Sequence, residues 1–447
     1  MQASEGEING ATGSVEKLSQ RRSPLLAGAM VLIVAGGAAL AVHSGNRPKS
    51  LDEIAFLDLS DHLAFEGRFA HANRPDLEGY DPGLPLDVLR PTAYRAPGYV
   101  WILTPLRRLG AGYPALRALN FLLVALCLAI LHALVSRQAG RLAGKIGVLL
   151  VLAYPVLFYA AGTLYPQTLA ALLLVTSVCL LDRLERTSRL RAYALAGLTY
   201  GALVLTVPVY LALSPIVALW LRCTRRSSSR QIALLVLALS APAGAWMARN
   251  ASVFHSPTGV ATSSGFNLLA GNGPYTRHDQ ATADVRWPKG VRQQLIGKNE
   301  AERDRIMVGA AMASLRERPR EAAELYAKKL VFWFAFRNEL ISDRIVPGGS
   351  GSGPPWLRDA VMAITYGLLL GILLVRLALV RSHPMQSLEG LILALYLGGG
   401  VAYAVYFTRI RFRLPFDWLL IALDAMFLGG LLAPRLRKGS FESSAAV

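Results

Sequence analysis

Two neighbouring carboxylates, Asp52 and Glu53, follow the first hydrophobic segment of the sequence, and Arg95 comes later in the same polar stretch, directly before Ala-Pro-Gly-Tyr. At a bilayer surface, a carboxylate can act as a general base toward a hydroxyl or an amine, or it can hold a divalent cation. A guanidinium beside a Pro-Gly bend can bind a phosphate through two parallel hydrogen bonds. Each residue also has an ordinary interpretation, since acidic side chains are common in the first turn of a helix and an interfacial arginine can simply extend toward water.

Four further polar residues lie in two later segments. Arg249 and Asn250 end a hydrophobic stretch, and Asn267 and Asn272 lie in the segments Gly-Phe-Asn-Leu and Gly-Asn-Gly-Pro. Glycines and amides of this kind are typical of turns, and they also allow a backbone to approach a sugar or a phosphate closely.

Three arginines, Arg409, Arg411 and Arg413, alternate in the segment TRIRFRLPF, just outside the last hydrophobic stretch. By the topology inferred below, they lie on the side of the membrane where few cations are expected. Their position against that bias predicts an anionic partner.

The composition places these residues in a membrane protein. Of the 447 residues, 53% are hydrophobic and 17% are charged, which is too much apolar surface for one soluble core and suits several membrane spans. The formal charge is +18, but the Lys and Arg residues cluster between apolar stretches, which favours a membrane topology over nucleic-acid binding. Three cysteines, two of them in apolar stretches, predict neither a disulfide framework nor a cysteine-based metal site.

We predict an all-α polytopic membrane protein with about ten transmembrane helices, since roughly 20 apolar residues cross the hydrocarbon core as a helix. The candidate spans are 25–43, 113–135, 146–164, 166–182, 192–207, 208–222, 231–248, 357–380, 388–407 and 414–433. The arginine-rich connectors fall on one side, so with an even number of spans both termini are expected in the cytoplasm. The first span is expected to stay uncleaved, because its polar leader is long for a signal peptide.

This topology divides the chain into five parts, which are a cytoplasmic tail (1–24), an N-terminal membrane module (25–248), a periplasmic loop region with interfacial helices (249–356), C-terminal membrane helices (357–434) and a second cytoplasmic tail (435–447). The first module contains a periplasmic loop at 44–112. Within this loop, amphipathic spacing predicts an interfacial helix at 51–69, and four prolines predict a loop at 73–91.

The periplasmic loop region has its own pattern. A charged helical run is expected at 298–329, and the aromatic patch at 332–336 is expected at the headgroup boundary. The stretch 348–355, rich in Gly, Ser and Pro, predicts a flexible connector before the next span.

Together, these segments resemble the glycosyltransferase-C superfamily, in particular the bacterial enzymes related to the protein O-mannosyltransferases and to the lipid A aminoarabinose transferase. LDEIAFLDLSDHLAFEGRF is similar to the family's interfacial helix with an acidic pair, and TAYRAPGYVWIL is similar to its Arg/Lys-x-Pro-Gly-Tyr element. AWMARNASVF and SSGFNLLAGNGP are similar to its Arg-Asn and Gly-x-Asn-Leu-x-x-Gly-Asn segments, and RIRFRLPFDWLL to its Arg-Tyr-Arg-Leu-Pro element. The five motifs occur in the family's order over residues 25–434.

The resemblance implies an inverting transferase that moves a sugar from a polyprenyl-phosphate donor to a lipid, glycan or protein acceptor, at the periplasmic face of the bacterial inner membrane. Asp52 would be the general base or an orienting carboxylate, with Glu53 as its catalytic neighbour. The residues that would bind the donor phosphate and the lipid-linked sugar are Arg95, Arg249, Asn250, Asn267, Asn272, Arg411 and Arg413. The arginines 95, 411 and 413 among them would neutralise the phosphate as it leaves.

Two positions depart from the family's pattern. Gln167 stands where many relatives carry a glutamate, and Val207 stands where they often carry an arginine before proline. These departures keep open a non-catalytic relative that binds the donor without turnover. A transporter or flippase of lipid-linked sugars is the other alternative, because several helices interrupted by prolines also suit transport.

No cofactor is expected. The first outer segment holds no Asp-x-Asp pair, so a divalent cation is not required, and we predict a metal-independent enzyme. The sequence also lacks a helical pair of histidines at metal spacing, a Gly-x-Ser-x-Gly elbow and a Walker phosphate loop, which excludes metalloprotease, serine hydrolase and ATPase functions.

Overall fold

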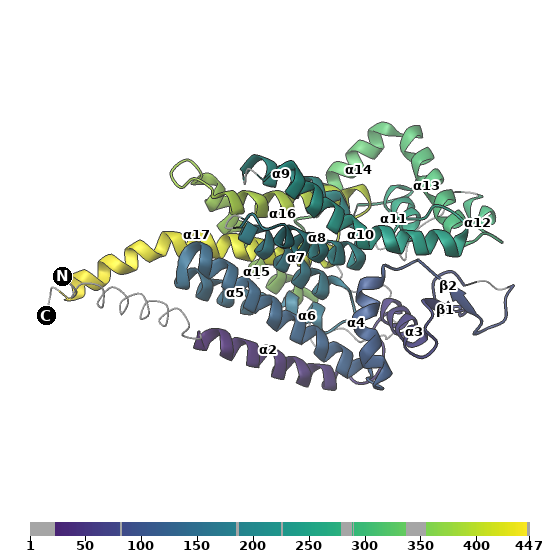
Figure 1. The fold of residues 1–447 in the computed structure, drawn as a ribbon, viewed down its shortest axis with the longest axis horizontal. Coiled ribbons are helices and arrows are strands. Elements are labelled where there is room, and N and C mark those ends of the chain that lie inside the picture. Colours follow the sequence, from purple (N-terminus) through teal and green to yellow (C-terminus); the bar gives the residue numbers. More distant parts are fainter. Residues whose placement is uncertain are drawn as a thin grey trace, which may run out of the picture.

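The structure is a computed structural model that describes residues 23–80, 83–184, 187–224, 227–278, 288, 290–336 and 355–444. Its long helices form a bundle, and the shorter outer elements gather at one end of it (Figure 1). Helix α2 (Pro24–His43) begins, and helix α17 (Ile410–Ser444) ends, at the opposite end of the bundle (Figure 1). The two large polar segments of the sequence therefore lie together, away from the start of α2 and the end of α17.

The remaining elements of the bundle are α5 (Tyr113–Leu152), α6 (Val156–Ala161), α7 (Gln167–Arg183), α8 (Leu190–Thr206), η2 (Pro208–Leu213), α9 (Ser214–Thr224), α10 (Ser229–Phe254), α15 (Pro355–Ala378) and α16 (Ser387–Val405). Six of the described helices are long and apolar enough to cross a membrane, namely α2, α5, α10, α15, α16 and α17. Helices α7 and α8, and the pair formed by η2 and α9, are shorter. The predicted all-α polytopic fold is confirmed, and each predicted span overlaps one or more of these helices.

Two predicted spans, 113–135 and 146–164, are joined in the structure. Helix α5 contains the first and the start of the second, and Gly140 forms the corner between its two limbs with φ 87°, a left-handed value that favours glycine. Helix α6 follows the second limb after Pro155. The arginine-rich connector between the two predicted spans is therefore a sharp corner between two helical limbs, with a non-helical residue at Gly140.

Helix α17 lies at the centre of the bundle. In the 18-residue apolar stretch of α17, 72% of the residues are buried, whereas the corresponding share for α2 is 22%. It packs against α5, α7, α15 and α16. A helix with neighbours on several sides is expected to carry apolar residues all around its own surface. The first turn of α17 is consequently held in place by protein on several sides.

The first outer segment contains α3 (Leu51–Phe65), which confirms the helix expected there. A short antiparallel ladder follows, in which β1 (Ala70–Ala72) pairs with β2 (Leu89–Pro91). The prediction of a loop throughout 73–91 is therefore wrong at its end, because a strand of three residues is too short to show alternation. Helix α4 (Pro97–Arg108) then begins with proline, a residue suited to the first helical position.

The second outer segment contains α11 (Ser264–Asn272), α12 (Val291–Gln294), α13 (Glu300–Glu317) and α14 (Pro319–Phe332). The single charged helix expected there is thus divided in two, because Pro319 cannot continue the hydrogen bonds of α13. The expectation of aromatic side chains at the headgroup boundary is wrong for Trp333. Its side chain is 2% exposed and packs against the rings of Tyr403 and Phe416.

Helix α17 continues to Ser444, so the predicted tail at 435–447 begins as a helix. The expectations for residues 1–22 and for the connector at 348–354 lie outside the described residues.

Candidate active site

The candidate site is built around the first turn of α3. The side-chain oxygen of Ser50 accepts a hydrogen bond from the backbone N–H of Glu53 at 3.3 Å, which caps the helix. Successive residues of a helix point about 100° apart, because one turn takes 3.6 residues. Asp52 and Glu53 therefore face different surroundings although they are neighbours in the sequence.

Glu53 is fully buried and joins three segments. Its carboxylate accepts hydrogen bonds from Nη2 of Arg117 at 2.8 Å, from the backbone N–H of Lys49 at 2.7 Å and from that of Leu164 at 2.9 Å. Arg117, on α5, is also fully buried. Both oxygens of Glu53 are thus occupied, which favours a structural part for this residue over the catalytic one expected from the sequence.

Asp52 lies between two arginines from distant segments. Its Oδ1 atom accepts a hydrogen bond from Nη2 of Arg95 at 2.7 Å, and its Oδ2 atom accepts one from Nη1 of Arg411 at 2.8 Å. Arg95 stands just before α4, and Arg411 is in the first turn of α17, so three elements meet at this carboxylate. The three side chains are between 13% and 19% exposed, which distinguishes this cluster from the closed pair of Glu53 and Arg117.

The two arginines keep unused donors. Within the described part of the chain, the Nε atoms of Arg95 and Arg411 are buried and donate to no acceptor. The guanidinium of Arg95 lies 4.6 Å from the ring centre of Phe56, and that of Arg411 lies 4.2 Å from the ring centre of Tyr165. These aromatic contacts hold both guanidinium planes in position. Two oriented guanidiniums with unused donors suit an anion with several oxygens.

Electrostatics keep Asp52 ionised. Burial alone would raise its pKa, but the charges of Arg95 and Arg411 and their hydrogen bonds outweigh burial and hold the pKa of Asp52 well below its usual range. For Arg95, burial acts against the charge, and Glu78 and Asp52 more than compensate, so its pKa is raised. Asp52 is therefore a weak base as long as both arginines contact it, and a ligand that draws them away strengthens it.

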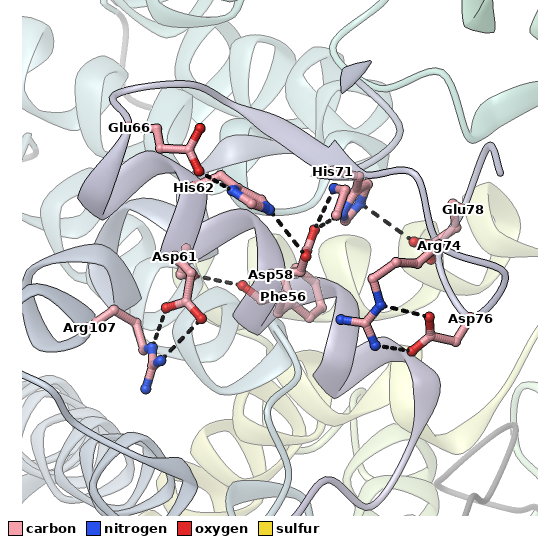
Figure 2. A network of polar contacts seen from close by, with 12 residues as sticks. Phe56, Asp58, Asp61, His62, Glu66, His71, Arg74, Asp76, Glu78 and Arg107 are labelled. Atoms are coloured by element: carbon pink, nitrogen blue, oxygen red, sulfur yellow. Dashed lines mark hydrogen bonds and ion pairs between the residues drawn. The ribbon is translucent and has the colours of Figure 1, made fainter. Parts of the chain in front are cut away.

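A second line of polar contacts, from Asp58 through His71 to Glu78, lies in the first outer segment (Figure 2). Asp58, on α3, contacts Nδ1 of His71 at 2.8 Å, and Nε2 of His71 lies 3.6 Å from Oε2 of Glu78. The other carboxylate oxygen of Glu78 accepts a hydrogen bond from Arg95. Glu78 is thus a second anionic anchor for the guanidinium that contacts Asp52.

Sequence analysis did not identify His71, Glu78 or Lys49 as site residues. His71 lies on β1 and Glu78 in the following turn, so their approach depends on a ladder that the sequence did not reveal. Lys49 is close to Asp52 in the sequence, and this proximity is the feature from which the sequence could have indicated it as a site residue. Burial, together with the charge of Arg117, lowers the pKa of Lys49 to about 8, against the opposing effect of Glu53.

The structure separates Arg413 from Arg411. Arg413 is fully buried and donates to Asp417 at 3.1 Å and to the carbonyl oxygen of Trp333 at 2.6 Å. Alternating residues share one side of a strand, but α17 already begins at Ile410, and residues two apart on a helix point about 200° from each other. Arg413 therefore has a structural part inside the bundle, away from Asp52, instead of the phosphate contact expected from the sequence.

Arg249 and Asn250 both bind backbone groups of the outer segments. Arg249 donates to the carbonyl oxygens of Thr92 at 2.7 Å and Phe69 at 3.1 Å, which ties α10 to the end of the ladder where β1 begins and β2 ends. Asn250 is fully buried and donates to the carbonyl oxygen of Gly259 at 2.9 Å. These side chains support the walls of the site without turning a polar group toward Asp52 in this structure.

The two asparagines of the Gly-rich segments differ. Asn272 is 8% exposed and donates to the carbonyl oxygens of Leu268 at 2.9 Å and Val405 at 2.8 Å, so it joins α11 to the end of α16. Asn267 is half-buried, and within the described residues its side chain makes no hydrogen bond. Of this pair, Asn267 keeps its amide available for a ligand.

Gln167, one of the two departures from the family's pattern, is buried at the start of α7. It lines a small cavity together with Leu414 and Trp418, which follow Arg411 on α17 by about one and two turns. Gln167 carries no charge and cannot form an ion pair. In the described part of the chain, the carboxylate that contacts Arg411 is that of Asp52. Val207, the other departure, directly follows the last residue of α8.

The described residues contain no group of three or more His, Cys, Asp or Glu side chains that could hold a metal ion. Metal independence stays a prediction.

These observations define a class of protein, a multi-pass helical membrane protein that gathers one carboxylate and two arginines at one end of its bundle. Residues 96–272 match the model of the Alg9-like mannosyltransferase family. The matched range begins directly after Arg95 and includes Arg249, Asn250, Asn267 and Asn272. The resemblance to the glycosyltransferase-C superfamily is confirmed over this part of the chain. No curated protein matches the sequence.

Three solved structures align with the chain at low identity. ArnT from Cupriavidus metallidurans, bound to undecaprenyl phosphate, is 15% identical with a TM-score of 0.39, and the alignment covers 91% of this chain and 80% of ArnT. The oligosaccharyltransferase of Archaeoglobus fulgidus in the apo form is 13% identical with a TM-score of 0.48, over 93% of this chain and 52% of that enzyme. The arabinosyltransferase EmbB from Mycobacterium smegmatis is 14% identical with a TM-score of 0.37, over 91% of this chain and 41% of EmbB. With TM-scores below 0.5, these similarities assign no role to any residue here.

The different surroundings of Arg411 and Arg413 predict different effects on stability. Arg413→Met leaves Asp417 buried without its partner, which costs about 3–5 kcal/mol of folding free energy. Arg411→Met should cost less, because Asp52 is partly exposed and keeps Arg95. Thermal unfolding of the purified variants in detergent measures both effects, and equal losses would contradict the assignment.

The low pKa of Asp52 predicts how its contribution to stability depends on pH. A carboxyl whose pKa is lower in the folded chain stabilises the fold above its unfolded pKa of about 3.9, and this contribution is lost as the pH falls through the folded pKa. The difference in thermal midpoint between the wild type and Asp52→Asn should therefore be constant from neutral pH down to about pH 4 and shrink below it. A difference that stays constant through the acid range would show that Asp52 is not held by the two arginines.

Proposed function

We propose that this chain is a membrane glycosyltransferase that moves a sugar from a lipid-phosphate donor to an acceptor hydroxyl or amine at the outer face of the membrane. The observation that carries the proposal is the position of Asp52 between Arg95 and Arg411. The family match over residues 96–272 supports sugar transfer as the class of reaction. The acceptor would be a lipid, a glycan or a protein.

The proposed reaction is a single displacement. The acceptor gives a proton to Asp52, its oxygen or nitrogen forms a bond to C1 of the sugar, and the bond between C1 and the phosphate oxygen breaks. The lipid phosphate leaves with the bonding electron pair, and Arg95 and Arg411 stabilise its growing negative charge. Attack from the face opposite the leaving group inverts the configuration at C1.

Donor binding would itself activate the base. A phosphate that takes the N–H donors of Arg95 and Arg411 removes the interactions that hold the pKa of Asp52 low. Burial then remains as the main influence, and it raises the pKa toward the range of a useful general base. Glu78 supports this exchange, because it anchors Arg95 while that guanidinium changes its partner.

The pocket around the donor would combine direct and indirect contacts. Arg249, Asn250 and Asn272 bind backbone carbonyls, so we propose that they shape the donor pocket through the segments they hold. Asn267, whose side-chain amide is unused, is the proposed direct contact to a sugar hydroxyl. Sugar selectivity would then depend on how α11, which carries Asn267, is placed.

The orientation in the membrane is also a proposal. At the end of the bundle opposite the site, Arg137 pairs with Asp182, and Gln231 binds the carbonyl oxygen of Ser188, so several of the arginine-rich connectors lie together. This grouping supports both termini in the cytoplasm and the site on the periplasmic side. A transporter would instead bind its substrate near the midplane of the membrane. Helix α3, which carries Asp52, lies at one end of the bundle (Figure 1), and this position favours the transferase.

Replacing the proposed base tests the reaction. Asp52→Asn should lower the rate of transfer about 10²- to 10⁴-fold, because it removes the proton acceptor. Asp76→Asn, a control in the same outer segment whose partly exposed carboxylate pairs with Arg74, should keep the wild-type rate. The measurement is transfer of labelled sugar in membrane vesicles supplied with polyprenyl-phosphate sugars, and full transfer by Asp52→Asn would remove Asp52 from the mechanism.

Chelation tests the proposed independence from metal ions. The rate of transfer should be the same before and after treatment of the vesicles with EDTA, because the two guanidiniums supply the positive charge for the leaving phosphate. Activity that disappears with EDTA and returns with magnesium would contradict this.

A further inference from the structure

Lys329, on α14, is a buried cation, and within the described residues no carboxylate pairs with it. Its side chain is 1% exposed, and Nζ donates three hydrogen bonds of 2.9 Å each, to the carbonyl oxygen of Gly271, to Oδ1 of Asn272 and to the carbonyl oxygen of Tyr406. Burial lowers the pKa of Lys329 to about 8, which leaves the ammonium, the form with three N–H donors, in the majority at pH 7.

The acceptors explain how a cation is stabilised there. Gly271 lies in the last turn of α11, and Tyr406 directly follows the last residue of α16. Carbonyl groups at the C-terminal end of a helix have no partner within it, and they carry the negative end of the helix dipole. Lys329 thus meets the negative ends of two helices, and it joins both of them to α14.

Further contacts surround Lys329 and join α11 and α14 to the end of α16 and the turn that follows it. The backbone carbonyl of Lys329 accepts a hydrogen bond from Oγ1 of Thr408 at 2.8 Å, and Asn272 donates to the carbonyl of Val405. At Gly271, a Cβ atom would lie 1.8 Å from the carbonyl oxygen of Tyr406, so α11 touches the turn at 406–409 backbone to backbone. A side chain at this glycine would displace the turn.

This turn leads directly into the candidate site. It ends where α17 begins, at Ile410, and Arg411 is the next residue. On the far side of Arg411, Nη1 of Arg413 binds the carbonyl oxygens of Trp333 at 2.6 Å and Ala335 at 2.8 Å, in the segment that follows α14. The end of α14 therefore holds the chain both before and after Arg411.

From this geometry we infer that Lys329 is a positioning residue, a latch that fixes the turn at 406–409 and thereby keeps Arg411 directed toward Asp52. Its effect on sugar transfer rests on the proposed function. Its effect on the turn does not, because the hydrogen bonds involved are present without any substrate.

Hydrogen exchange of the purified full-length protein in detergent tests the latch directly. In Lys329→Met, the backbone amides of residues 405–411 should exchange about tenfold faster than in the wild type, because the turn opens locally without global unfolding. The matched control is Lys328→Met, which removes an exposed lysine from the neighbouring position and should leave this exchange unchanged. Unchanged exchange in Lys329→Met would overturn the inference, whether or not the protein transfers sugar.

Transfer kinetics test whether Lys329 acts through Arg411. Lys329→Met alone should lower the transfer rate about tenfold, since small displacements of a positioned group are costly. In an Arg411→Met background the same substitution should add nothing, because residues that act through one another are not additive. Additive losses would show that Lys329 does not work through Arg411. If wild-type protein transfers no sugar while the exchange result holds, the proposed function fails and the latch stands.

A milder variant keeps the inference testable if Lys329→Met does not fold. Thr408→Val preserves shape and removes the hydrogen bond to the carbonyl of Lys329. It should speed exchange in the same residues about threefold, which corresponds to an ordinary hydrogen bond. Wild-type exchange in this folded variant would contradict the latch.

Discussion

A charge that is taken out of water needs a partner, and this constraint explains how several of the described elements are joined. Inside the bundle, Arg413 pairs with Asp417, and at the outer end Glu53 pairs with Arg117; all four side chains are fully buried. Each pair fixes one element against another and leaves little room for exchange. Asp52 follows the same rule in a looser form, since it and its arginines keep part of their surface exposed. Its partners can therefore be exchanged for those of a ligand.

Lys329 satisfies the constraint in another way, because carbonyl and amide oxygens take the place of a counter-ion. A carboxylate near the site would compete with Asp52 for the arginines. Oxygens from helix ends stabilise the ammonium without adding a full negative charge. The outer segments and the last membrane helix are thus joined without disturbing the balance of charge around Asp52.

The sequence was sufficient for those features that depend on local pattern. Apolar length predicted the membrane helices, and amphipathic spacing predicted α3. The acidic pair and Arg95 indicated the end of the bundle at which the candidate site lies. Features that depend on where an element begins were not predictable in the same way. The start of α17 decides that Arg411 meets Asp52 while Arg413 points into the bundle, and nothing in TRIRFRLPF states that register. The line from Asp58 through His71 to Glu78 depends on a ladder of three residues per strand, below the length at which periodicity is visible.

The contact between Asp52 and Arg411 joins residues 359 positions apart, from the first outer helix and the last membrane helix. A chain made and inserted from its N-terminus has Asp52 and Arg95 in place long before α17 emerges. During that interval the carboxylate has one arginine instead of two, and the anion site lacks half of its positive charge. Completion of the site therefore coincides with insertion of the final helix, so a chain interrupted during synthesis carries Asp52 and Arg95 but lacks Arg411.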